Sequence, residues 1–129
     1  MNKLNYASYP ASNKLVDAGI ILETYVYWAR DEKGWYLRIP DTYFREVLES
    51  IPAPSMAEIL IELPTITSIH KIDGHYTGYK VEYVPSHLRS DNIQFATYNT
   101  NPIDALIDLL IWKRKEESKM GEIASEEKQ

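Results

Sequence analysis

The segment 100–115, TNPIDALIDLLIWKRK, constrains the fold most, because it specifies the start, the buried side and the end of one helix. Asn101 can cap this helix, Pro102 suits its first turn, and Asp104 places a carboxylate near the positive end of the helix dipole. Its apolar residues recur at helical spacing and form one stripe: Ile103, Leu106, Ile107, Leu110 and Ile111. A stripe of this kind must be buried, so the helix predicts a packed core.

Composition predicts one domain, residues 1–115, since 129 residues with 44% hydrophobic content fit a single core. The absence of cysteine excludes disulfides, thiolate nucleophiles and sulfur-ligated zinc. The segment 116–129, EESKMGEIASEEKQ, is polar and aperiodic, and we expect a frayed helix end followed by a charged, disordered tail.

The net charge of -5 lies mostly in that tail, which holds five Glu against two Lys. A nearly neutral body offers little attraction for phosphate backbones, so nucleic acid is disfavoured as a partner. The first residues, MNKLNYASYP, lack the apolar run of a signal peptide, and no apolar run approaches the roughly 20 residues that cross a bilayer. We expect a cytoplasmic protein without a membrane partner.

The first part of the chain predicts a helix, a hairpin and a second short helix. The helix covers 9–18, and Gly19 ends it in the left-handed conformation while Ile20 folds back onto Leu15. TYVYWAR and WYLRI, joined by DEKG, predict a β-hairpin whose Gly34 closes the turn on a bulge. A short helix is then expected from Asp41 or Thr42, with these apolar residues: Phe44, Val47, Leu48 and Ile51.

The rest of the chain predicts a helix, three strands and the terminal helix. Ser55 and Glu58 form a capping-box pattern at the start of a helix that Pro64 ends. Segments 66–72 and 75–84, joined by a two-residue Asp73-Gly74 turn, predict a hairpin, and 93–98 predicts a further strand. We therefore expect an α+β domain with one antiparallel sheet of about five strands, covered on one face by the N-terminal, middle and C-terminal helices.

Four stretches of the chain carry a resemblance over residues 12–116: SNKLVDAGIILET, the YW pair of the hairpin, IPAPSMAEILIELP and NPIDALIDLLIWKRKE. With these motifs the chain resembles a group of small uncharacterised proteins from phages, prophages and mobile elements of gut Bacteroidales bacteria. It departs from the group where Pro54 precedes Ser55, since a tryptophan-serine pair is frequent there. The resemblance implies no known activity, cofactor or functional residue.

Candidate catalytic groups are few. The predicted two-residue turn places His70 and His75 as diagonal neighbours on one sheet face, with Asp73 nearby. These three are the metal candidates, although a functional site usually has three or four ligands, and two partly exposed histidines are the alternative. Carboxylates four residues apart on the terminal and middle helices could divide acid and base roles or bind a metal, or could simply be solvated: Asp104 and Asp108, and Glu58 and Glu62. No cofactor is expected.

Aromatic residues with a polar group are the most unusual feature, with ten Tyr and three Trp against two Phe. In the first hairpin, Tyr25, Tyr27 and Trp35 are expected to alternate with Val26, Trp28 and Tyr36, so that rings project from both faces. Either these rings only stabilise the sheet by cross-strand pairing, or one face is an interaction surface. The candidate residues for that surface are Tyr25, Tyr27, Trp28, Arg30, Trp35, Tyr36, Arg38 and Trp112.

Trp112 projects nearly opposite the apolar stripe of the terminal helix. Either another segment of the chain covers it, or it faces solvent and is available to bind a partner.

Three functional hypotheses follow from these features. The leading one is a non-enzymatic phage or mobile-element protein that binds another protein or itself. The alternatives are a small nucleic-acid-binding protein, in which Tyr and Trp stack on bases beside Arg30 and Arg38, and a metal-dependent enzyme built on His70 and His75.

Overall fold

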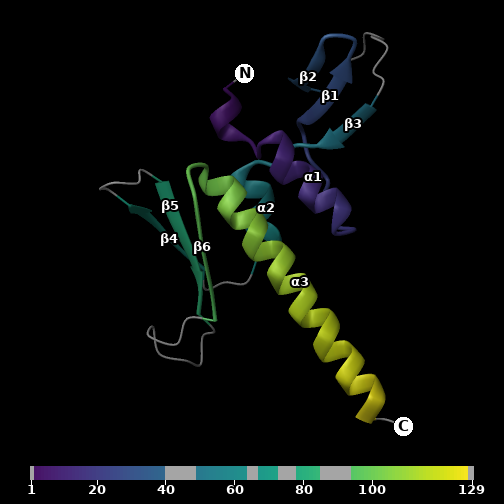
Figure 1. Cartoon of the computed structure of the whole chain (residues 1–129), viewed down its shortest axis with the longest axis vertical. Coiled ribbons are helices and arrows are strands. Elements are labelled where there is room, and N and C mark those ends of the chain that lie inside the picture. The colour runs from purple at the N-terminus through teal and green to yellow at the C-terminus, as the bar shows by residue number, and fades with distance from the viewer. Residues whose placement is uncertain (1, 40–48, 64–66, 73–77, 85–93, 128–129) are drawn as a thin grey trace.

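The computed structural model describes residues 2–39, 49–63, 67–72, 78–84 and 94–127, and it confirms the α+β class. In chain order (Figure 1), the elements are the short 3-10 helix η1 (Lys3–Asn5), α1 (Tyr9–Asp17), β1 (Tyr27–Asp31), β2 (Gly34–Arg38), β3 (Glu49–Pro52), α2 (Met56–Glu62), β4 (Thr67–Ile72), β5 (Gly78–Tyr83), β6 (Phe95–Asn99) and α3 (Pro102–Glu127).

The strands form two separate three-stranded antiparallel sheets, β2-β1-β3 and β4-β5-β6, and not the single five-stranded sheet that the sequence predicted. The difference arises at β3, where a helix was expected to end. Ile51 of β3 pairs with Trp28 of β1 and both are buried, so the first hairpin acquires its own third strand. Residues 41–48 of the predicted helix lie outside the described residues.

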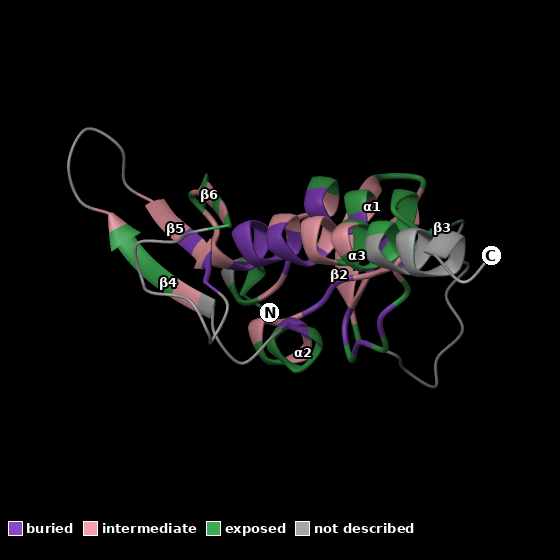
Figure 2. Cartoon of the chain, turned by 90° about the horizontal axis from the view of Figure 1, so that it is seen from below, coloured by how far each residue is buried: buried purple, intermediate pink, exposed green. Residues whose placement is uncertain are grey.

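The main core surrounds the N-terminal half of α3, as the apolar stripe of that helix predicted. Helix α3 packs against β5 and β6 of the second sheet, while α1 and α2 pack against α3 (Figure 1). The buried part of α3 is its N-terminal half (Figure 2), where Leu106, Ile107 and Leu110 are fully buried. The helices therefore pack mainly on one another, and only α3 covers a sheet broadly.

Helix α3 continues to Glu127 and so extends well into the segment 116–129, where the sequence predicted fraying and then disorder. Its side chains are exposed at Glu117, Ser118 and Lys119, as expected for a polar stretch beyond the core. The division of the chain at residue 115 stays a prediction. Within the described part of the chain, no helix combines the length and the apolarity needed to cross a bilayer.

Helix α1 begins and ends as predicted, and its cap is Ser8. The Ser8 hydroxyl accepts a hydrogen bond from the Ala11 amide at 3.3 Å. At the other end Gly19 has φ +75°, and the Ile20 amide donates to the Leu15 carbonyl at 3.0 Å. The left-handed glycine and this hydrogen bond are features of a Schellman motif, so residues next to the helix end are sufficient to stop it.

Helix α2 has the predicted capping box, in which the Ser55 hydroxyl accepts from the Glu58 amide and the Glu58 carboxylate accepts from the Ser55 amide. The apolar residues of this segment are only partly buried. Ile59 and Leu63 join the core, whereas Leu60 is 42% exposed.

Ser12 on α1 offers a test of this core, because its hydroxyl is fully buried and has no hydrogen-bond partner among the described residues. An unsatisfied buried hydroxyl costs about 1 to 3 kcal/mol. We expect Ser12→Ala to raise the free energy of unfolding by about 1 kcal/mol, measured by urea denaturation. Ser8→Ala, the same change at the helix cap, should lower it by about 1 kcal/mol. A loss of stability in both variants would show that the Ser12 hydroxyl is satisfied in solution.

Candidate interaction surfaces

The first sheet is anchored to the body by its inner face. Trp28 is buried, its indole N–H donates to the Ala7 carbonyl at 2.9 Å, and its ring meets the Tyr9 ring edge-on at 6.4 Å between centroids. The Trp35 ring stacks on the same Tyr9 ring at 4.3 Å. These contacts use Trp28 and Trp35 for packing within the chain, and the sequence alone did not assign Tyr9 to them.

The strand register corrects the predicted distribution of rings. Arg30 pairs with Trp35 and Trp28 pairs with Leu37, so Trp35 lies on the same face as Trp28. Tyr36 pairs with Ala29 and therefore lies on the face of Tyr27. The sequence predicted Trp35 on the face of Tyr27 and Tyr36 on the face of Trp28. An error of one residue in the strand register is enough to exchange them, because it moves every side chain of the strand to the other face.

The outer face of the first sheet keeps the remaining polar aromatics. Six of its residues, Tyr27, Ala29, Tyr36, Arg38, Ser50 and Pro52, form what we call the outer tyrosine face, and Asp31 and Gly34 lie on the same side next to the hairpin turn. Tyr27 and Arg38 are directly paired across the strands, and Tyr36 lies beside them next to Ala29. Two residues before Tyr27, Tyr25 is 67% exposed, and its backbone amide donates to the Glu58 carboxylate at 2.9 Å. Tyr27, Tyr36 and Arg38 are half-buried and Ala29 is buried, so a paired backbone holds the rings and the arginine with part of their area at the surface.

Arg30 and Arg38 do not act together. Arg30 lies on the inner face and forms an ion pair with Glu49 at 3.4 Å, whereas Arg38 lies on the outer tyrosine face. The nucleic-acid hypothesis placed both arginines beside the same rings, so it loses one of its two cations.

Trp112 is covered by the second sheet. Its ring stacks on Phe95 at 5.1 Å and meets Tyr83 at 5.7 Å, and Lys113 next to it donates to the Tyr83 hydroxyl at 3.1 Å. Of the two alternatives for this residue, the structure has the one in which another segment packs on that side of the helix. Trp112 therefore does not offer a free ring to a partner.

The metal candidates are only partly described, because Asp73 and His75 lie outside the described residues. His70 pairs with Lys80, and Ile72 pairs with Gly78, so five residues connect β4 and β5 where the sequence predicted a two-residue turn. A two-residue turn would pair His70 with Thr77, so the predicted register of this hairpin is wrong. The His70 side chain is 57% exposed and its Nε2 lies 3.9 Å from the Glu82 carboxylate. In the described residues, no three acidic or histidine side chains gather as metal ligands would.

A row of polar side chains crosses the solvent face of the second sheet. His70, Lys80 and Tyr98 are paired across β4, β5 and β6, the Lys80 ammonium forms an ion pair with Glu82, and the His70 Nε2 lies 3.9 Å from the same carboxylate. The hydrogen bond from the ammonium to the Glu82 carboxylate raises the pKa of Lys80 above its ordinary value. Lys80 therefore stays charged throughout the physiological range and is already neutralised by its neighbour.

The four carboxylates proposed as acid–base pairs have structural partners. Asp104 is buried and accepts a hydrogen bond from the Ser8 amide at 2.9 Å, which joins the starts of α1 and α3. Glu58 caps α2, and Glu62 accepts from Arg114 at 2.8 Å. These contacts account for three of the carboxylates without a catalytic role.

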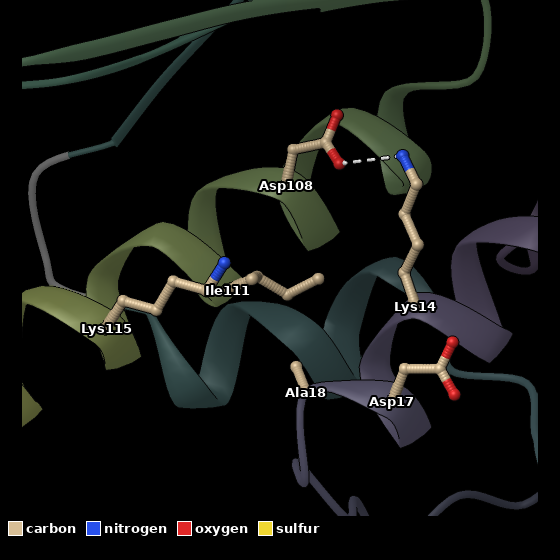
Figure 3. Close-up of a pocket in the computed structure, with 6 residues that line it drawn as sticks. All are labelled: Lys14, Asp17, Ala18, Asp108, Ile111 and Lys115. Atoms are coloured by element: carbon tan, nitrogen blue, oxygen red, sulfur yellow. Dashed lines mark ion pairs between the residues drawn. The ribbon is translucent and has the colours of Figure 1, made fainter.

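Asp108, the fourth carboxylate, lies at a pocket of about 380 Å³ between α1 and α3. The pocket is lined by Lys14, Asp17, Ala18, Asp108, Ile111 and Lys115, as Figure 3 shows. The Lys14 ammonium is 3.5 Å from Asp108, whose other oxygen accepts from the Thr97 hydroxyl at 3.4 Å. Two cations and two anions alternate around an open hollow, so its charges do not select a ligand of either sign.

No known family model, curated protein or solved structure matches this chain. The candidate surface therefore rests on its own geometry. Of the eight predicted interface residues, the structure gathers Tyr27, Tyr36 and Arg38 on one outward face with Tyr25 exposed nearby, and it packs the three tryptophans within the chain.

Proposed function

We propose that this chain is a non-enzymatic accessory protein of a phage or mobile element that acts by binding another protein through the outer tyrosine face. The observation that carries the proposal is the distribution of aromatic rings in the first sheet. The inner face has Trp28 and Trp35 packed on Tyr9, while Tyr27, Tyr36 and Arg38 face away from that anchor. The phage or mobile-element origin rests on the sequence resemblance alone.

The composition of the face supports protein binding. Tyr and Arg are enriched at the energetically dominant positions of protein interfaces, because a ring buries much area at a small cost in entropy and a guanidinium adds planar hydrogen bonds. Ser50 is exposed and Pro52 half-buried, and both are small and lie beside the rings, which leaves room for a partner's side chains. A paired strand backbone also limits the ordering cost of binding.

Protein binding is preferred to nucleic-acid binding for an electrostatic reason. Phosphate binding needs several cations beside the stacking rings, and the register leaves Arg38 as the cation among the six residues of the outer tyrosine face. The net charge of -5 opposes long-range attraction of a polyanion. An enzyme at His70 and His75 stays a hypothesis, which zinc or manganese titration followed by thermal melting would test.

Photo-crosslinking of the full chain in its host tests the proposal. A benzoylphenylalanine introduced at Tyr36 should give one discrete adduct, and the same group at exposed Glu117 on α3 should give none. Tyr27→Ala should weaken the association that yields the adduct by about 2 kcal/mol and change the free energy of unfolding by less than about 1 kcal/mol. Equal adducts from both positions, or an adduct that Tyr27→Ala leaves unchanged, would remove the outer tyrosine face as the binding site.

A further inference from the structure

The edge strands of the two sheets differ in how they are protected against pairing with another strand. The edge strands are β2 and β3 in the first sheet and β4 and β6 in the second. Edge strands are usually protected by charged residues or proline. Arg38 lies in β2, Glu49 and Pro52 in β3, and Lys71 in β4. Strand β6, with the sequence FATYN, contains neither a charged residue nor a proline.

Among the strands that the structure describes, β6 is the last of its sheet, so one of its edges has no described strand beside it. It pairs with β5 along its other edge and packs against α3 on one face (Figure 1). On the opposite face Tyr98 is 63% exposed and Ala96 is exposed as well. A polar but uncharged edge with an exposed ring has the properties of a strand that accepts another strand.

The sequence of β6 is complementary to itself in the antiparallel direction. If two copies pair about Thr97, residue 96 of each copy lies opposite residue 98 of the other, so each large Tyr98 ring meets a small Ala96 side chain. Phe95 likewise lies opposite Asn99, and no two like charges face each other. A small side chain opposite each ring avoids steric conflict, and the main-chain hydrogen bonds of the new antiparallel ladder supply the association.

We propose that two copies of this chain associate through β6 in antiparallel pairing, joining their second sheets into one six-stranded sheet. The two-fold axis passes at Thr97 perpendicular to the sheet, so the contact is the same surface on both copies. Both α3 helices then lie on the same side of the joined sheet. This interface is distinct from the outer tyrosine face, and either one can be present without the other.

Two charge variants at exposed positions test the pairing. In Ala96→Lys/Tyr98→Lys, lysine faces lysine twice across the proposed interface. In Ala96→Lys/Tyr98→Glu, lysine faces glutamate twice. Within the chain, position 96 is paired with Glu82, so the lysine there faces a carboxylate in both variants. Position 98 is paired with Lys80, which repels the introduced lysine and attracts the introduced glutamate, so the stability of each variant is compared by thermal melting. Sedimentation velocity over about a hundredfold range of concentration measures the monomer–dimer equilibrium of each protein.

We expect a concentration-dependent dimer for the wild type and for the lysine–glutamate variant. The two-lysine variant should have a dissociation constant at least about tenfold higher, and this defect should shrink in high salt, which screens the repulsion. Ala57→Lys/Ile61→Lys, which adds the same charges on the exposed side of α2, is the control and should dimerise like the wild type. A wild type that stays monomeric throughout, or a dimer that the two-lysine variant leaves intact, would overturn the proposal. Thermal melting of each variant verifies that it is folded.

Discussion

Leu106→Ala is expected to lower the free energy of unfolding by about 3 to 5 kcal/mol, one of the two largest effects among the substitutions considered. Leu106 is fully buried on α3, in the cluster to which α1, α2 and β5 all contribute. Removing its branched end loses transfer free energy and leaves a cavity that three packed elements cannot close. Native stability is commonly about 5 to 15 kcal/mol, so this loss is a large part of the total. Urea denaturation followed by circular dichroism measures it.

The matched control for that substitution is Leu60→Ala, which makes the same chemical change on α2 at a position that is 42% exposed. We expect a loss of less than about 1 kcal/mol there, because little apolar area returns to water and no enclosed cavity forms. Equal losses at the two positions would show that the exposed side of α2 is covered in solution, by a second copy or by another segment.

Trp28→Ala is expected to lower the free energy of unfolding by about 3 to 5 kcal/mol, because it weakens the packing of the first sheet. Its ring joins β1 to the N-terminal segment by packing on Tyr9 and by a buried hydrogen bond to the Ala7 carbonyl. The buried cluster of the first sheet is small, consisting of Val26, Trp28, Ile51 and Ala53. Loss of Trp28 should therefore open the first sheet before the main core.

Hydrogen exchange distinguishes that local opening from global unfolding. In Trp28→Ala the amides of β1, β2 and β3 should lose protection, while those of α3 and β5 keep most of theirs. Trp28→Phe keeps an aromatic ring at this position but removes the indole N–H that donates to the Ala7 carbonyl. It should lower the free energy of unfolding by about 1 to 3 kcal/mol. Uniform loss of protection across both sheets would mean that the first sheet and the main core unfold as one unit.

Local structure followed the sequence closely where a few neighbouring residues specify it. The cap at Ser55 and Glu58, the left-handed Gly19 and the turn of the first hairpin before Gly34 were all predicted, and each depends on contacts within about five residues. The cap of α3 belongs to the same group, since the Asn101 side chain accepts from the Ile103 amide at 2.9 Å. Such signals need no knowledge of the rest of the chain.

The candidate site was predicted only in part. Aromatic residues and arginine correctly drew attention to the first hairpin, but the sequence could not say which rings are used for packing. Tyr9 decides that question by stacking on Trp35 and meeting Trp28, and it comes from a helix outside the hairpin. A tyrosine at the start of a helix, next to Pro10, carries no signal that would have revealed this contact.

The sequence by itself determined where α1, α2 and α3 begin, where α1 and α2 end, and that one stripe of α3 must be buried. The tertiary structure decided that the strands form two sheets, that five residues separate Ile72 from Gly78, and that Trp35 shares a face with Trp28. The physical reason is the range of the interactions involved. Helix ends depend on bonds between near neighbours, whereas strand partners and register are selected by side chains that meet only after the chain has folded.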